Sequence, residues 1–224
     1  MRIMLLCNAG LAIECENEIL LVDALNVTEQ PFAGISDELW ERILNRKPPF
    51  DRVCGLYFTH LHPDHCDMRK VKQYQSKWPD IPCWLPDETT QHGTLHFGSF
   101  AVEYGRVSHA PMDEPLPDHV VTWIAAGERR VYIAADAALE PKSHKVFLYE
   151  RTADVAFWNS MYLSRPETRE LLSRTSARNY IYHMPETNPD GYGIWKKCNN
   201  NLQRYADEMK SVRVLKHYPT VIEL

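Results

Sequence analysis

Three short apolar runs, separated by turn residues, occupy the beginning of the chain. Such runs are typical of strands joined in hairpins, and Asn-Ala-Gly and Glu-Asn supply the turn residues between them. The predicted strands span residues 2–7, 11–15 and 18–24. The spacing of the apolar positions then changes to that of a helix. Leu39 and Ile43 share one helical face behind a candidate N-cap at Ser36, which predicts a helix over residues 36–44.

A continuous apolar strand over residues 52–59 and a helix over residues 67–78 follow, and strands then dominate as far as residue 136. Gly127 and Glu128 predict a hairpin turn between two of these strands. Later segments alternate: strands over 155–158 and 179–183, helices over 166–174 and 199–209, and a last strand over 212–218. Hairpins followed by alternating helices and strands indicate layered α/β packing with mixed sheets.

The length and composition are those of an ordinary globular protein. The 224 residues suffice for one sizeable core, and no repeat or linker divides them, so we expect a single domain over residues 1–224. The formal net charge is −5 and no run of Lys or Arg exceeds a pair, so we expect no nucleic-acid partner. No segment approaches the roughly 20 apolar residues of a membrane span, so we expect no membrane contact.

Cysteine usage indicates a compartment. The six cysteines are scattered without a Cys-x-x-Cys pair. The apolar stretch near the start is about five residues long, which is shorter than the core of a secretory signal. We therefore expect reduced thiols and a cytoplasmic location.

The most informative stretch is Thr-His-Leu-His-Pro-Asp-His-Cys, residues 59–66, which begins where a predicted apolar strand ends. His60 and His62 are two residues apart, so on an extended backbone their side chains point the same way. The intervening proline then turns the chain, and Asp64 and His65 follow. The segment can offer one pair of ligands to one ion and a second pair to a neighbouring ion. The alternative, a surface loop with chance histidines, explains so dense a cluster poorly.

The histidine and aspartate side chains of this segment indicate which metal ions the site would bind. Imidazole and carboxylate groups suit zinc, iron or manganese. Because cysteine is missing from this set, a closed structural zinc site is disfavoured.

His-Leu-His-Pro-Asp-His, residues 60–65, resembles the His-x-His-x-Asp-His signature of the metallo-β-lactamase-fold hydrolase superfamily. Further elements of that pattern occur in order, because His109, Asp136 and His183 each follow or end a predicted strand. With the N-terminal strands included, the resemblance covers essentially the whole chain. It implies an α/β (α+β) fold, built as a four-layer αββα sandwich with two mixed β-sheets.

The resemblance also implies two divalent metal ions, with zinc preferred over manganese or iron. The implied ligands are His60, His62 and His109 for one ion, Asp64, His65 and His183 for the other, and Asp136 as a bridge. Two ions about 3.5–4 Å apart would lower the pKa of a bridging water enough to supply hydroxide near neutral pH. We hypothesise that Asp64 also orients that water, which makes Asp64 and Asp136 the expected catalytic residues.

The chain departs from the family pattern directly after this motif. Cys66 and Asp67 stand where the family usually carries a glycine, and a bulkier residue there can change the shape of the pocket. Cys66 is interpreted as a packing residue; the alternatives are a spare ligand or an oxidation-prone thiol.

Polar and aromatic side chains outside this motif are the next candidates for functional roles. The segment after His183 is expected to be a loop whose side chains either line the substrate pocket or are simply exposed: Glu186, Asn188, Tyr192 and Trp195. The remaining histidines are interpreted as surface or supporting residues: His92, His96, His119, His144 and His217. Trp78 and Trp84 fit either a homodimer surface or inward packing.

The family hydrolyses lactams, thioesters, lactones and phosphodiesters, and it includes some redox enzymes. Aspartate rather than cysteine at position 136 disfavours the largest group of true β-lactamases, and His62 in place of glutamate disfavours the di-iron oxygen reductases. Too few residues follow His183 for the helical domain of the glyoxalase II type. The tRNA-processing nucleases share the ligand set, but this chain lacks their long inserted arm and positive charge.

A small-substrate hydrolase is left as the expected function. A phosphodiester is the first choice because paired metals suit in-line displacement at phosphorus, although the sequence assigns no Arg or Lys to a phosphate. A lactone or other ester is the second choice. A non-catalytic metal-binding or ligand-binding module and an iron-loaded redox enzyme remain as alternatives.

Overall fold

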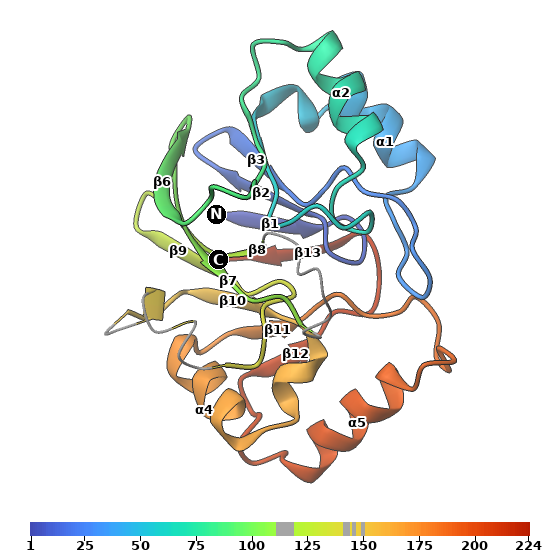
Figure 1. Cartoon of the computed structure of the whole chain (residues 1–224), viewed down its shortest axis with the longest axis vertical. Coiled ribbons are helices and arrows are strands. Elements are labelled where there is room, and N and C mark those ends of the chain that lie inside the picture. Colours follow the sequence, from blue (N-terminus) through green and yellow to red (C-terminus); the bar gives the residue numbers. More distant parts are fainter. Residues whose placement is uncertain (111–118, 141–143, 145–146, 149–150) are drawn as a thin grey trace.

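Two β-sheets lie face to face in the computed structural model, and helices cover their outer faces (Figure 1). The structure describes residues 1–110, 119–140, 144, 147–148 and 151–224.

The first sheet has, among the described residues, six strands in the order β13-β1-β2-β3-β4-β5. Their bounds are Arg2–Leu5 (β1), Leu11–Cys15 (β2), Glu18–Val22 (β3), Val53–Tyr57 (β4), Cys83–Trp84 (β5) and Thr220–Glu223 (β13). The strands from β13 to β3 pair antiparallel, whereas β3, β4 and β5 run parallel. The sheet is therefore mixed, as expected.

The second sheet has seven strands in the described part of the chain, in the order β12-β11-β10-β9-β8-β7-β6. Their bounds are His92–Phe97 (β6), Phe100–Val107 (β7), His119–Ala126 (β8), Arg129–Ile133 (β9), Val155–Trp158 (β10), Asn179–Ile181 (β11) and Val212–Val214 (β12). The meander from β6 to β9 is antiparallel, and β9 to β12 are parallel.

Among the described residues, two pairs of helices form the outer layers (Figure 1). Their bounds are Asp37–Leu44 (α1) and Met68–Lys77 (α2) on the first sheet, and Pro166–Thr175 (α4) and Ile194–Arg204 (α5) on the second, with short 3-10 turns at Phe50–Arg52 (η1) and Ser160–Leu163 (η2). The Ser36 side chain accepts a hydrogen bond from Leu39 N at 3.3 Å, so the predicted N-cap of α1 is confirmed.

Three clusters of buried apolar side chains, among the described residues, fill the interfaces between the four layers. One joins residues of the two sheets, such as Leu5 and Phe157. A second packs the first sheet against α1 and α2, and a third packs the second sheet against α4 and α5. Because each sheet buries both of its faces, strands such as β10 are apolar throughout rather than alternating. The expected four-layer αββα sandwich is confirmed.

The C-terminal elements differ from the sequence prediction. The last helix begins at Ile194 and ends at Arg204, not at 199–209. The Asp190 carboxylate accepts hydrogen bonds from the backbone N–H groups of Ile194 and Trp195, which starts the helix five residues early. The predicted strand 212–218 stops at Val214, and β13 was not predicted, because its register depends on β1, a strand more than 200 residues away.

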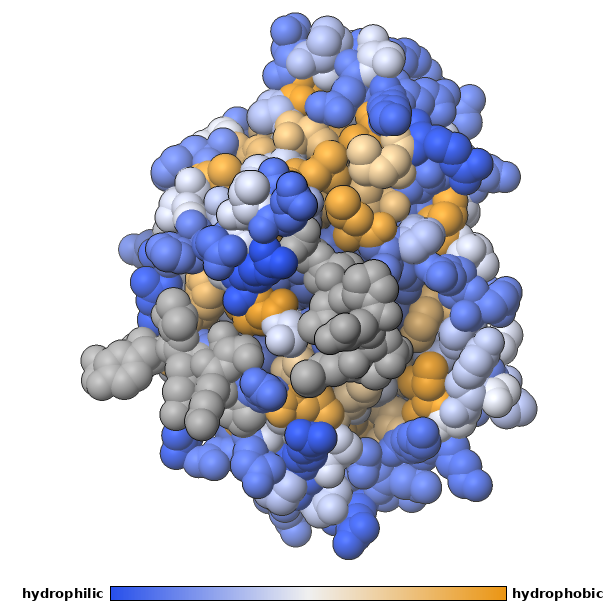
Figure 2. All heavy atoms as spheres, viewed as in Figure 1, coloured by the Kyte–Doolittle hydropathy of each residue, from blue (hydrophilic) through white to orange (hydrophobic). Residues whose placement is uncertain are grey.

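The surface of one face carries hydrophilic residues over the helices at both ends of the molecule, with apolar patches across the middle (Figure 2). The two tryptophans considered for a dimer surface both pack inward. Trp84 stacks on Tyr57 at 5.0 Å between ring centroids, and Trp78 donates a hydrogen bond to Leu44 O. Within the described residues, no helix is long and apolar enough to cross a membrane.

Candidate metal centre

The seven predicted ligands come together at one edge of the two sheets. They lie on loops that follow strands: His60, His62, Asp64 and His65 after β4, His109 after β7, Asp136 after β9, and His183 after β11. Because β3 and β4 run parallel in one sheet and β9 and β11 run parallel in the other, the loops at their carboxyl ends meet at the same edge.

Backbone hydrogen bonds shape the loop after β4. The His62 carbonyl accepts hydrogen bonds from His65 N at 2.9 Å and from Cys66 N at 2.7 Å, which closes a tight turn behind Pro63. The turn separates the side chains into two groups. His60 and His62 contact His109, and Asp64 and His65 contact His183.

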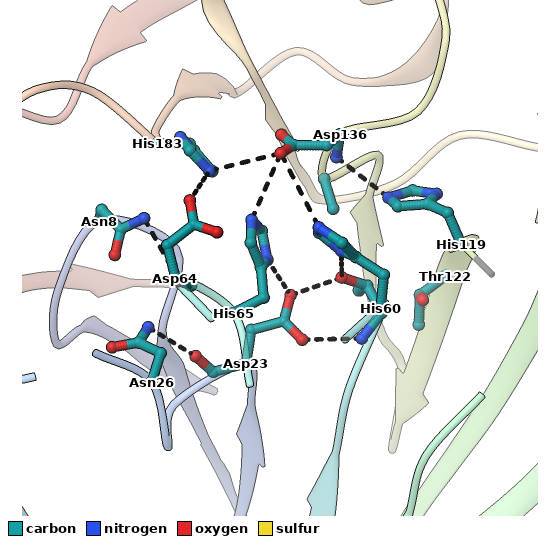
Figure 3. Close-up of polar contacts among 12 residues, drawn as sticks. Asn8, Asp23, Asn26, His60, Asp64, His65, His119, Thr122, Asp136 and His183 are labelled. Atoms are coloured by element: carbon teal, nitrogen blue, oxygen red, sulfur yellow. Dashed lines mark hydrogen bonds and ion pairs between the residues drawn. The ribbon is translucent and has the colours of Figure 1, made fainter. Parts of the chain in front are cut away.

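Asp136 lies between the two groups (Figure 3). Its Oδ2 atom is 3.4 Å from His183 Nε2 and 3.5 Å from His65 Nε2. The same oxygen is 3.7 Å from His109 Nε2 and 4.0 Å from His60 Nε2. One carboxylate oxygen is thus surrounded by imidazole nitrogens from both groups.

Charge and burial set the protonation states. Burial, followed by the neighbouring histidines, lowers the pKa of His60 well below its usual range, and burial lowers the pKa of His109 to about 4. Burial alone would raise the pKa of Asp136, but the charges of His183 and His65 lower it far below its usual value. His60 and His109 are therefore neutral and Asp136 is ionised, which are the forms that bind metal ions.

Asp23, at the end of β3, is a residue that the sequence analysis missed. Its carboxylate is fully buried and accepts hydrogen bonds from His65 Nδ1 at 2.9 Å and from Thr59 Oγ1 at 2.6 Å (Figure 3). Thr59 thereby uses its only hydroxyl hydrogen, so its oxygen can only accept from His60 Nδ1, 3.1 Å away. Both histidines therefore carry a proton on Nδ1 and turn Nε2 towards the centre of the site.

His119 holds the backbone of Asp136. It is buried, burial lowers its pKa well below its usual range, and its Nε2 accepts a hydrogen bond from Asp136 N at 3.1 Å. Asn159 and Tyr162 hold the flanking residues, because Asn159 donates to the carbonyl of Ala135 and Tyr162 to that of Ala137. The position of the central carboxylate is thus fixed from three directions.

Backbone strain gathers around the site. Asp23, Ala135 and His183 have φ angles of 50°, 45° and 54°, a region that residues other than glycine rarely adopt. Each of the three is itself a residue of the site or precedes one directly. The surrounding hydrogen bonds maintain these conformations, as is common where side chains must be placed for function.

The donor set fits divalent metal ions. Nε2 of His65 and Nε2 of His183 are buried and lack a hydrogen-bond partner of acceptable geometry. Three groups of ligand atoms each lie within 4.8 Å of one another: His60, His62 and His109; His60, His65 and Asp136; Asp64, His65 and His183. Buried imidazole nitrogens that lack a hydrogen-bond partner and lie beside carboxylates suit zinc, iron or manganese.

A cavity of about 930 Å³ opens above these ligands. Its lining includes His62, Asp64, His109, Asp136 and His183 on the floor. The upper walls come from residues 29–32, from the η2 segment and from α5. The cavity therefore connects the ligand cluster with solvent.

None of the four pocket residues expected from the sequence is among the described residues that line this cavity: Glu186, Asn188, Tyr192 and Trp195. Trp195 lies on the buried face of α5 and donates a hydrogen bond to Pro185 O, and Tyr192 is 63% exposed. The earlier start of α5 explains the position of Trp195, because it places that residue in a helix. Glu186, Asn188 and Tyr192 stay in the loop before the helix and are exposed. The helix contributes other residues to the wall, at positions that its period predicts once its bounds are known.

Cys66 packs in the apolar cluster between the first sheet and its helices. It is 3% exposed, its thiol contacts Met68 Sδ at 3.7 Å, and burial raises its pKa. Next to it, Asp67 takes the place where a glycine was expected and caps α2 by accepting from Arg69 N at 3.0 Å. The residue that replaces the family's glycine thus serves as the N-cap of α2.

No protein-family model matches this sequence, and no curated protein matches it. Solved structures nevertheless share its fold. A possible metal-dependent hydrolase from Veillonella parvula superposes with a TM-score of 0.71 at 14% identity, over 100% of this chain and 99% of that chain. A metallo-β-lactamase fold protein from Bacillus subtilis gives a TM-score of 0.63 at 13% identity, over 99% and 98% of the two chains.

The third comparison is with a redox enzyme. The diiron β-hydroxylase CmlA from Streptomyces venezuelae superposes with a TM-score of 0.67 at 15% identity, and the match covers 100% of this chain and 54% of that chain. Taken together, the comparisons show that this chain has the metallo-β-lactamase fold. At these identities they show the fold alone, so the chemistry has to be argued from the site.

Proposed function

We propose that this chain, which has the metallo-β-lactamase fold, is a hydrolase that holds two divalent metal ions and acts on a small substrate. The position of Asp136 carries the proposal. Its Oδ2 lies 3.7 Å from His109 Nε2 and 3.5 Å from His65 Nε2, atoms that belong to the two separate groups of ligands. A carboxylate oxygen between two such groups suits a ligand that two ions share.

The proposed ligands follow the two groups: His60, His62 and His109 for one ion, Asp64, His65 and His183 for the other, with Asp136 common to both. When bound, such ions lower the pKa of a coordinated water and polarise the scissile group. Zinc is the preferred ion, and manganese or iron are alternatives.

Asp64 is the residue proposed to handle the attacking water. It lines the cavity, and its Oδ2 is 3.0 Å from His183 Nε2. Burial opposes ionisation, but the close contact with His183 lowers the pKa of Asp64 overall, so the carboxylate is ionised at neutral pH. It can therefore accept a hydrogen bond from a water at the floor of the cavity and orient it.

The proposed substrate is a small phosphodiester. In its hydrolysis the water oxygen bonds to phosphorus, the P–O bond to the leaving group breaks, and one water proton passes to the departing alkoxide. The products are a phosphate monoester and an alcohol. The cavity of about 930 Å³ is within the usual range for small-molecule sites. A lactone or other ester is the second choice of substrate for the same ligand cluster.

The proposed partner is a small molecule. The net charge of −5 supports a small-molecule substrate over nucleic acid. A homodimer and a cytoplasmic location stay predictions.

The test measures metal content per chain by elemental analysis and hydrolysis of bis(4-nitrophenyl) phosphate in the same preparation. We expect about two ions per chain and turnover. His62→Ala should lower both metal content and turnover, whereas the matched control His96→Ala, on exposed β6, should change neither. Less than one ion per chain after reloading would overturn the ligand assignment.

The remaining outcomes separate the alternatives. Two ions without phosphodiester turnover would move the search to lactones and other esters. No turnover across all three classes would favour a metal-binding or ligand-binding module. The diiron hydroxylase that shares the fold keeps a redox role open, and oxygen consumption by the iron-loaded protein would support it.

A further inference from the structure

The face of α5 forms one wall of the cavity. Ile194, Lys197, Asn201 and Arg204 line it, together with Asn200. The spacings of three, four and three residues place the first four on one side of the helix. The Asp190 carboxylate fixes the beginning of this helix, as described above, so the wall belongs to a regular element rather than to a loop.

Two cations of this wall, Lys197 and Arg204, have no acidic partner in the part of the chain that the structure describes. Within the described residues, neither Lys197 nor Arg204 forms an ion pair with a carboxylate, and both side chains are exposed. Two acids that follow α5 in the sequence are engaged elsewhere, because Glu208 pairs with Arg169 at 2.7 Å and Asp207 is 3.4 Å from Lys210. Unpaired cations beside amide side chains, in a chain of net charge −5, point to an anionic ligand.

The lining of the cavity combines charged and apolar side chains. Asp64 and Asp136 lie on the floor, among the ligand histidines. Five apolar side chains also belong to the lining: Phe32, Ala110, Leu139, Met161 and Ile194. Phe32 packs against the His183 ring, at 4.1 Å between ring centroids. Glu29, from the loop that contains residues 29–32, is also among the described lining residues. A ligand that fits this arrangement has its reactive group at the floor, an apolar body and an oxyanion at the other end.

We propose that Lys197, Asn201 and Arg204 bind an oxyanion at the end of the substrate that lies away from the scissile bond. The substrates of this site are then small diesters or esters whose second end carries a carboxylate or a phosphate. This inference rests on the proposed function for the reacting end. Arg204 can donate two parallel hydrogen bonds to an oxyanion, and Lys197 adds a second positive charge.

The test compares two phosphodiesters that differ only at the far end, phenyl 4-carboxybutyl phosphate and phenyl pentyl phosphate. Dissociation constants are measured by titration calorimetry on the metal-loaded protein. We expect the carboxylate probe to bind about tenfold more tightly, since hydrogen bonds to charged groups have roughly that effect. A third probe, which ends in a phosphate, shows which oxyanion is preferred, and tighter binding of either one supports the inference.

Charge-reversal variants test whether Lys197 and Arg204 cause the preference for the anionic probe. The double variant Lys197→Glu, Arg204→Glu should lose or invert the preference, whereas Lys196→Glu, next to it on α5 but outside the lining, should keep it. Equal affinity of wild type for all the probes, binding of none of them, or a preference that survives the double variant would overturn the inference.

The two proposals fail separately. A protein that prefers the anionic probes but hydrolyses no diester would refute the proposed reaction and leave the oxyanion site. One that hydrolyses bis(4-nitrophenyl) phosphate without any preference would do the opposite.

Discussion

The Asp23 carboxylate lies beneath the candidate metal centre (Figure 3) and is not among the described residues that line the cavity. It accepts hydrogen bonds from Thr59 N at 2.7 Å, from Thr59 Oγ1 and from His65 Nδ1. Through these bonds it fixes the tautomers of two histidines, so it is a positioning residue. Such supporting carboxylates raise the basicity of the ligands that they hold.

Asp23→Asn tests this role. The amide keeps the shape but presents one acceptor where the carboxylate presents two, so we expect metal affinity to fall by about 10- to 100-fold. Chelator competition measures the affinity, with exposed Asp80→Asn as the control. Unchanged affinity with the fold intact would show that Asp23 only supports the fold.

His144 offers a pH-dependent test away from the ligands. It is buried between Tyr132 and Tyr162, with its ring nitrogens 2.5 and 2.8 Å from their hydroxyls, and burial lowers its pKa to about 4. The unfolded chain, with a histidine pKa near 6.5, therefore binds more protons between pH 6.5 and 4. Stability supplied by neutral His144 is complete above pH 6.5 and is lost as the pH falls towards 4.

The comparison is with His144→Gln, which cannot titrate. We expect the free energy of unfolding of wild type to fall by roughly 3 kcal/mol more than that of the variant between these pH values. Denaturant unfolding at a series of pH values measures both slopes. Parallel slopes would contradict the assignment.

At the scale of elements, α5 depends on one side chain at its beginning. Asp190 accepts hydrogen bonds from Tyr192 N at 2.8 Å, from Ile194 N at 3.1 Å and from Trp195 N at 2.7 Å. Gly193 precedes the helix with a φ of 74°, a conformation that suits glycine. These contacts, rather than the apolar pattern alone, decide which residues face the cavity.

Asp190→Ala should therefore loosen the wall. Loss of this cap is expected to lower the free energy of unfolding by about 1 kcal/mol, as for other helix caps. It should also weaken binding of phenyl 4-carboxybutyl phosphate, because Lys197 and Arg204 are held less firmly. Asp207→Ala, fully exposed and beyond the end of α5, is the control for both measurements. A stable variant with unchanged binding would mean that α5 is ordered by its buried face alone.

At the scale of the whole molecule, the site joins the two halves of the sandwich. Asp23, His60 and His65 follow strands of the first sheet, whereas His109, Asp136 and His183 follow strands of the second. A metal ion bound by ligands from both sheets would link the two sheets at this edge. Metal binding should therefore contribute to global stability.

Removal of metal tests this coupling. Dialysis against a chelator should lower the midpoint of thermal unfolding, and added zinc should restore it. At an ion concentration about 1,000 times the dissociation constant, the expected stabilisation is about 4 kcal/mol. An unchanged midpoint, with metal loss verified by elemental analysis, would show that the site does not couple the sheets.

The sequence by itself determined most of the elements and the ligand types. Apolar periodicity and turn residues are local signals, so the hairpins, the Ser36 cap and the strand before His60 could be predicted from neighbouring positions. The residues of the His-x-His-x-Asp-His segment are close in sequence, so their division into two pairs followed from backbone geometry and a proline.

Only the tertiary structure decided how distant positions combine. Asp23 gave no sequence signal beyond an aspartate after an apolar strand, because its role depends on His65, 42 residues away. Lys197 and Arg204 could not be assigned to any ligand, since that requires the true beginning of α5 and the loops opposite. The central place of Asp136 likewise arises because two sheets pack face to face and bring their strand ends to one edge, a contact that no local pattern encodes.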